Sequence, residues 1–124
     1  MESIGLVIVS HSKHIAEGVV ELISKVAKDV PITYVGGTEG GGIGTSFDQV
    51  DRVVSENLAD TLLAFFDLGS AKMNLKMVTD FSDKSIIINR VPIVEGAYNA
   101  AALLQTGAEL SVIQTQLAEL EINK

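Results

Sequence analysis

The chain has 124 residues, of which 47% are apolar and 20% are charged, and we expect them to form one globular domain spanning residues 1–124. The net charge of −7 argues against nucleic-acid or anionic-membrane partners, which require clustered Lys and Arg. The absence of cysteine excludes disulfides and zinc–thiolate sites. No apolar run approaches the roughly 20 residues that cross a bilayer, and no basic leader precedes Ile4, so we expect a cytoplasmic protein.

The first third of the chain predicts a strand, a helix and a second strand. Residues 4–9 form a nearly continuous apolar run, which is typical of a strand buried on both faces of a parallel sheet. Apolar residues recur at helical spacing over 15–26, and residues 32–35 form a second strand between Pro31 and a glycine pair. Strand and helix therefore alternate from the start.

A glycine-rich loop at 40–44 leads to the second predicted helix. Ser46 and Gln49 are in capping-box register at its start. Its apolar stripe runs from Phe47 through Val50 and Val54 to Leu58. The stripe predicts that this helix extends at least as far as residue 58.

The remaining sequence continues the alternation. We expect strands at 62–66 and 85–89, separated by a helix from residue 70 to about residue 79. Two helices, 95–105 and 109–120, complete the chain on either side of Gly107. Strands that alternate with helices indicate an α/β fold: an open, doubly wound, four-stranded parallel sheet with helices on both faces. We expect the strand order 2-1-3-4, with the first and third strands adjacent.

In such a sheet, functional residues gather beyond the carboxyl ends of the central strands. His11 follows the first strand and Asp67 follows the third. A histidine here can serve as a phosphoryl acceptor, and a neighbouring carboxylate can bind its other ring nitrogen and orient it. The less specific interpretation is that His11 is a surface polar residue and that Asp67 caps the next helix. The pattern alone leaves both interpretations open.

Several groups near these positions could bind phosphoryl oxygens through hydroxyls or backbone amides at the starts of helices. The glycine-rich loop could equally be a mobile turn. Residues 37–42 match the glycine spacing of an ATP-binding P-loop, but the required Lys and Ser/Thr do not follow, so we exclude that motif. The phosphate-binding candidates are Ser10, Ser12, Gly44, Thr45, Gly69 and Ser70.

Other proteins of this fold class fit less well. A receiver domain would accept phosphate on an aspartate such as Asp67, but it needs acidic magnesium ligands after the first strand, where this chain has Ser-His-Ser. A flavin-binding module would need a loop rich in hydroxyls and glycine at the same place. His14 lies three residues after His11, but without further His or Cys a metal site is not expected.

Six segments, taken in order along the chain, resemble the DhaM family, the phosphotransferase-system subunits of bacterial dihydroxyacetone kinase. Their first domain is related to mannose-family enzyme IIA. The resemblance covers essentially the whole chain. The segments are Val7-Ile8-Val9-Ser10-His11-Ser12, Ala16-Glu17-Gly18-Val19, Gly36-Gly37-Thr38, Ile43-Gly44-Thr45-Ser46, Asp67-Leu68-Gly69-Ser70-Ala71 and Val94-Glu95-Gly96-Ala97.

The resemblance implies that His11 is phosphorylated by phospho-HPr and passes the phosphoryl group to ADP on the DhaL subunit, which works with DhaK. No cofactor or metal is expected on this subunit, since ADP and magnesium belong to DhaL. Two alternatives remain: an enzyme IIA of a mannose-type sugar permease that serves a IIB protein, and a non-catalytic interaction module.

The resemblance also implies a homodimer. The apolar residues of the last two predicted helices point the same way, because they exceed what one face of a four-stranded sheet needs. These residues are Ala100, Ala101, Leu103, Leu104, Leu110, Ile113, Leu117 and Leu120.

Overall fold

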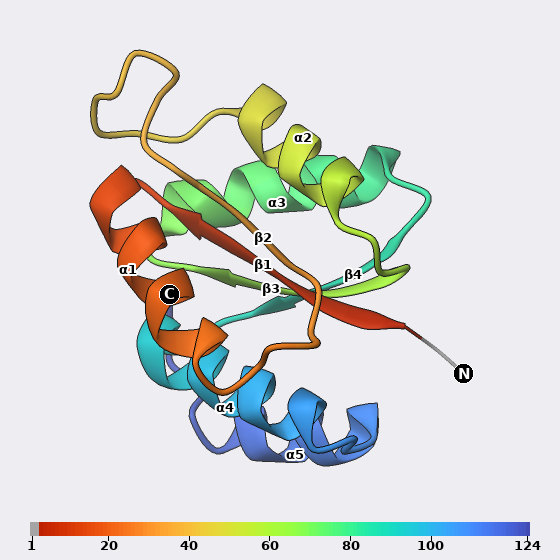
Figure 1. Cartoon of the computed structure of the whole chain (residues 1–124). Coiled ribbons are helices and arrows are strands. Elements are labelled where there is room, and N and C mark those ends of the chain that lie inside the picture. The colour runs from red at the N-terminus through yellow and green to blue at the C-terminus, as the bar shows by residue number, and fades with distance from the viewer. Residues whose placement is uncertain (1–2) are drawn as a thin grey trace.

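A computed structural model describes residues 3–124, which form a four-stranded parallel sheet between two layers of helices (Figure 1). The strand order is β2-β1-β3-β4, so the predicted α/β class and the predicted order are both confirmed. The strands are β1 (Ile4–Ser10), β2 (Ile32–Gly36), β3 (Thr61–Phe66) and β4 (Ser85–Asn89). The helices are α1 (Lys13–Ser24), α2 (Phe47–Glu56), α3 (Gly69–Phe81), α4 (Ile93–Gln105) and α5 (Leu110–Ala118).

The two faces of the sheet bury separate apolar cores. Alternate residues of β1 point to opposite faces, so Leu6 and Ile8 pack with α1, α4 and α5, whereas Val7 and Val9 pack with α2 and α3. Figure 1 shows the corresponding helices on opposite sides of the strands. Burial on both faces explains why the central strands are continuous apolar runs rather than alternating ones.

The parallel register places the carboxyl ends of the central strands side by side. In β1, Val9 pairs with Phe66 of β3 and Ser10 pairs with Gly36 of β2. The next residues of the first and third strands are His11 and Asp67. The register therefore brings together two residues that lie 56 positions apart in sequence.

The second helix ends earlier than its apolar stripe predicts. Helix α2 stops at Glu56, and Leu58 is 90% exposed, so its predicted place in the stripe is wrong. The buried Asn57 explains the difference, because its Nδ2 donates to the Leu6 carbonyl at 3.0 Å and its Oδ1 accepts from the Ala59 amide at 3.0 Å. This side chain draws the backbone inward and ends the helical periodicity.

The terminal helices bury their apolar residues within the chain. Ala100, Ala101, Ile113 and Leu117 belong to the core, and Leu103, Leu104, Leu110 and Leu120 are partly buried against it. These eight residues are thus wholly or partly buried within the chain and do not by themselves require a partner, and the homodimer stays a prediction. Among residues 3–124, no helix is long and apolar enough to cross a membrane.

Candidate functional site

The site begins where β1 ends. Ser12 is the N-cap of α1, with extended backbone angles, and its hydroxyl accepts a hydrogen bond from the Ile15 amide at 3.3 Å. His11 occupies the short link between strand and helix, and its side chain is only 13% exposed. The sequence thus places the imidazole between a buried strand end and the amino terminus of a helix, as predicted.

The carboxylate of Asp67 is the centre of the site's hydrogen bonds. Its Oδ1 lies 2.8 Å from His11 Nδ1 and accepts from the Leu68 amide at 2.7 Å. Its Oδ2 accepts from the Ser10 hydroxyl at 2.6 Å and from the His11 amide at 3.0 Å. Four donors surround one side chain that is 13% exposed. Such saturation holds the carboxylate in a single orientation toward the ring.

These bonds keep the Asp67 carboxylate ionised. Burial by itself raises the pKa of Asp67, but the hydrogen bonds from Ser10, the His11 ring, the His11 amide and the Leu68 amide outweigh it, and the net pKa is lowered. The group is therefore an acceptor at neutral pH. It can accept a hydrogen bond from the protonated ring nitrogen of His11, and the proton stays on that nitrogen.

The two nitrogens of the His11 ring face different partners. Because an ionised carboxylate can only accept, Nδ1 carries the proton and donates to Asp67. In the neutral form of the ring, the second nitrogen, Nε2, then has a free lone pair and accepts from the hydroxyl of Ser70 at the exposed start of α3. Of the two ring nitrogens, Nε2 is therefore the one that is not bound to the carboxylate and lies at the exposed side of the pair.

The six phosphate-binding candidates separate into two groups of three. Ser70 contacts the ring, and Gly69 is the first residue of α3. Gly44 approaches through its backbone, since its amide donates to the His11 carbonyl at 2.9 Å. The structure therefore brings Ser70 to the imidazole and Gly44 to the backbone of His11, and it places Gly69 directly before Ser70.

Three other candidates have their hydroxyls engaged elsewhere. Ser10 is buried and donates to Asp67, and Ser12 caps α1. The Thr45 hydroxyl accepts from Asn74 of α3 at 3.4 Å. These hydroxyls organise the surroundings of the imidazole, and none of them has a hydrogen bond to the ring.

His14 is exposed on the first turn of α1. Within residues 3–124, no group of three or more His, Cys, Asp or Glu side chains could share a metal ion. The expected absence of a metal stays a prediction.

A family model described as the PTS system fructose IIA component, EIIA-man, matches residues 5–114. The chain belongs to the EIIA-man family. The matched region runs from the first residues of β1 into α5 and includes both His11 and Asp67.

Within this family, the chain is 53% identical over 120 residues to the phosphotransferase subunit DhaM of the PTS-dependent dihydroxyacetone kinase of Lactococcus lactis, covering 97% of this chain and 98% of that protein. It is 50% identical over 118 residues to the phosphoryl donor subunit DhaM of a dihydroxyacetone kinase of Listeria innocua, covering 95% of each. The crystal structure of EF1359, a protein of unknown function, matches 98% of this chain and 97% of its own, with a TM-score of 0.84 and 27% identity. The predicted resemblance to the DhaM family is confirmed.

Sequence reasoning missed one charged residue beside the His11–Asp67 pair. Lys124 follows α5, and its Nζ donates to the carbonyl oxygens of Phe66 and Asp67. No motif marks it, because it belongs to no helix or strand and lies 57 residues from Asp67 in sequence. The hydrogen bond from Ser10 to Asp67 was also missed. Ser10 directly precedes His11 in sequence and therefore lies at the same strand end.

Proposed function

We propose that this chain is the phosphoryl donor subunit of a dihydroxyacetone kinase and carries the phosphoryl group on Nε2 of His11. The names of its relatives support the kinase assignment. The observation that carries the proposal is the pairing of His11 Nδ1 with the ionised Asp67 at 2.8 Å, which leaves Nε2 as the free nucleophile.

The proposed transfer keeps the proton of the ring in place. Nε2 attacks the phosphorus of phospho-HPr, a bond from nitrogen to phosphorus forms, and the bond to the HPr histidine breaks. The Nδ1 proton stays on the ring and continues to donate to Asp67, which offsets the positive charge that forms on the imidazole. The Ser70 hydroxyl must turn away from Nε2 and can then donate to a phosphoryl oxygen.

Two helix amino termini support binding of the phosphoryl group. Helices α1 and α3 both begin at the carboxyl edge of the sheet, directly after the residues that form the pair. The first-turn amides of a helix have no intrahelical acceptor and favour anions. Leu68, the N-cap of α3, provides no side-chain hydrogen bond, so the amides that begin this helix at Gly69 and Ser70 are the best candidates.

The acceptor we propose is ADP held with magnesium on the DhaL subunit, which acts with DhaK on dihydroxyacetone. In the proposed relay this subunit itself needs no cofactor or metal, and it acts in the cytoplasm together with its proposed partners. A homodimer remains part of the proposal and follows from the family resemblance alone. Sedimentation equilibrium at tens of micromolar tests it, and a monomer at that concentration would contradict it without affecting the chemistry.

The decisive experiment is incubation of the protein with enzyme I, HPr and phosphoenolpyruvate, followed by intact mass measurement. We expect one phosphoryl group per chain, labile to acid and stable to base, as a phosphoramidate is. An acid-stable label would assign the acceptor to a hydroxyl such as Ser70. No label at all would leave a non-catalytic interaction module of the same fold.

The matching family description, a PTS system IIA component, favours one second candidate. In that case the phosphorylated protein would donate to a IIB protein of a sugar permease. Mixing the isolated phosphoprotein with ADP-loaded DhaL or with a mannose-type IIB protein separates the two functions. We expect rapid loss of the label, with formation of ATP, only with DhaL.

A further inference from the structure

A lysine side chain lies against the carboxyl end of β3, behind the proposed phosphorylation site. The Nζ of Lys124 donates to the Phe66 carbonyl at 2.6 Å and to the Asp67 carbonyl at 3.3 Å. The same ammonium lies 4.4 Å from the centroid of the Phe66 ring. A cation is therefore bound to the backbone of the residue whose side chain orients His11.

The tail that carries Lys124 is held by contacts from separate parts of the chain. The Ile122 amide donates to the Arg90 carbonyl at 2.9 Å, and the Arg90 guanidinium pairs with Glu121 at 3.0 Å. The Lys72 ammonium of α3 donates to the backbone oxygen of Lys124 at 2.7 Å. Although each exposed contact is weak alone, together they fix the tail along the sheet edge and aim its lysine at β3.

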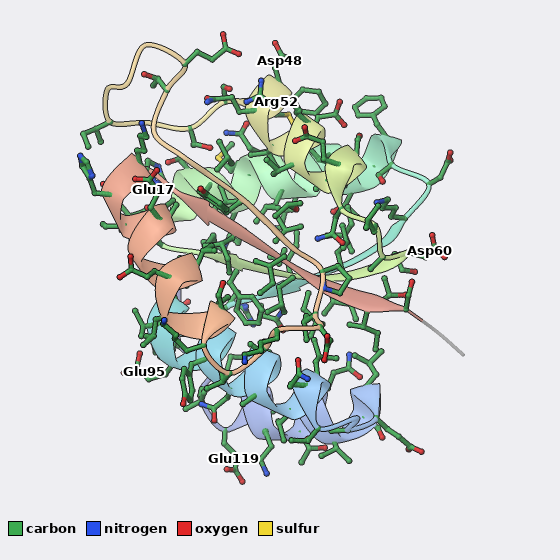
Figure 2. The ribbon with its side chains drawn as sticks, viewed as in Figure 1. Glu17, Asp48, Arg52, Asp60, Glu95 and Glu119 are labelled. Atoms are coloured by element: carbon green, nitrogen blue, oxygen red, sulfur yellow. The ribbon has the colours of Figure 1, made fainter. Side chains whose placement is uncertain are left out.

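Lys124 places a positive charge within a molecule that is acidic as a whole. The chain has a net charge of −7, and Figure 2 shows labelled acidic side chains, such as Glu17, Glu95 and Glu119, on the outer surfaces of the helical layers. Phosphorylation of His11 would add nearly two negative charges beside the Asp67 carboxylate. Like charges in a partly buried site repel strongly, and a nearby cation offsets the repulsion.

Lys124 and Asp67 already interact through charge. Burial lowers the pKa of the Lys124 ammonium, and the negative charge of Asp67 offsets part of this effect, so that the net pKa is lowered. The attraction therefore supports an ammonium at this half-buried position. Any negative charge added at His11 would likewise favour the protonated form of Lys124.

We propose that Lys124 stabilises the phosphorylated state of His11 by offsetting the negative charge that Asp67 and the phosphoryl group bring together. This inference rests on the proposed phosphorylation of His11. Lys124 acts through the backbone of Asp67 and through its charge, so it is a positioning residue rather than a catalytic one. Its loss should shift the phosphoryl equilibrium between HPr and this protein toward HPr.

An equilibrium measurement separates this role from a purely orienting one. A residue that only orients the nucleophile changes the forward and reverse transfer rates equally and leaves the equilibrium constant unchanged. The test mixes phospho-HPr with wild-type protein, Lys124→Gln, Lys124→Met or Lys124→Arg and measures both phosphoproteins at equilibrium by intact mass. Gln keeps a hydrogen-bond donor without the charge, and Arg keeps the charge. Melting temperatures establish that each variant is folded.

We expect the Gln and Met variants to lower the equilibrium constant about three- to tenfold, as suits a charge partly screened by solvent. Lys124→Arg should remain within about twofold of wild type. The matched control is Lys28→Met, which makes the same change in net charge in the exposed turn between α1 and β2. This variant should leave the equilibrium constant unchanged.

Three results would overturn the inference: neutral variants with the wild-type equilibrium constant, an Arg variant that behaves like Met, or an equal shift in Lys28→Met. If the neutral variants transfer more slowly but keep the wild-type equilibrium constant, the inference is also overturned. Lys124 would then only hold the backbone of Asp67 in position. A wild-type protein that takes no phosphoryl group from phospho-HPr would instead contradict the proposed function itself.

Discussion

The two sides of the site are built differently. On the β3 side, Asp67 receives four hydrogen bonds, two of them from His11, and the Ser70 hydroxyl contacts the ring. On the β2 side, residues 37–45 form an open loop whose hydrogen bond to His11 is one backbone contact, from the Gly44 amide to the His11 carbonyl. One side determines the orientation of the imidazole, and the other only supports its backbone.

This difference assigns separate tasks to the two sides. Orientation and charge compensation come from side chains that are 13% exposed at the strand ends, where the sheet allows little movement. On the β2 side, Gly40 and Gly41 are exposed, and a Cβ at either position would meet nothing within 4 Å. We therefore expect changes on the β3 side to affect the chemistry far more than changes in the loop.

The largest expected effect is that of replacing the acceptor. His11→Gln should abolish labelling from phospho-HPr, because no other group supplies the nucleophilic nitrogen, and the fold should persist since the ring lies at the sheet edge. His14→Gln is the control and should label normally. Intact mass after incubation with enzyme I, HPr and phosphoenolpyruvate gives the answer. Labelling lost only in the His14 variant would reverse the assignment.

The next largest effect should come from Asp67→Asn. Asn keeps the shape but loses the charge, and its amide can present a donor to Nδ1, which favours the wrong tautomer. Losing such assistance typically costs roughly 10²–10⁴-fold. Single-turnover transfer from phospho-HPr and to the acceptor should each fall by at least about tenfold in a folded variant. Wild-type rates would reduce Asp67 to a residue that merely organises the start of α3.

Removing the hydroxyl at Nε2 should have an intermediate effect. In Ser70→Ala the ring keeps its bond to Asp67 but loses the donor that we expect to turn toward the phosphoryl group. The loss of one hydrogen bond of about 1 kcal/mol corresponds to about a fivefold slower transfer. Ser82→Ala, at the other end of α3, is a matched control. A Ser70 variant faster than wild type would mean that the hydroxyl blocks Nε2 rather than assists transfer.

The loop should tolerate most changes, and Gly44 is the exception. Gly44 has φ +146°, and a Cβ there would lie 2.9 Å from Thr38 Cγ2, so Gly44→Ala strains the backbone that binds His11. We expect about a two- to fivefold loss of transfer rate, which means that only part of the roughly 1–3 kcal/mol of such strain reaches the transfer step. Gly40→Ala meets nothing within 4 Å and should match wild type. Equal losses in both variants would show that the loop acts through its mobility.

The smallest effect concerns stability in acid. Because the folded-state pKa of Asp67 lies below the ordinary value of 3.8, its contribution to stability is fully present above that value and is lost as pH falls through the lowered pKa. Asp67→Asn should therefore show a smaller drop in the free energy of unfolding than wild type below about pH 4. Urea titrations from pH 6 downward measure it. Identical pH profiles would mean that the hydrogen bonds of Asp67 do not distinguish its folded and unfolded states.

Much of the architecture followed from patterns that are local in sequence. Apolar runs such as residues 4–9 predict doubly buried strands, and the predicted cap of α2 is present, since the Ser46 hydroxyl accepts from the Gln49 amide. The end of α2 was not predictable in this way. Asn57 there turns inward to the Leu6 carbonyl, a contact between residues 51 positions apart, and Leu58 is left exposed.

By itself, the sequence determined that strands alternate with helices and that His11 and Asp67 each follow a buried strand. Those features depend on periodicity and on order along the chain. Only the tertiary structure decided which ring nitrogen is free, that Ser10 serves Asp67, and that Lys124 returns to the end of β3. Each of these contacts joins residues 56 or more positions apart, and the register of β1 with β3 and the path of the tail set them. Local sequence patterns cannot predict such contacts, because the residues that make them come together only when the sheet has formed.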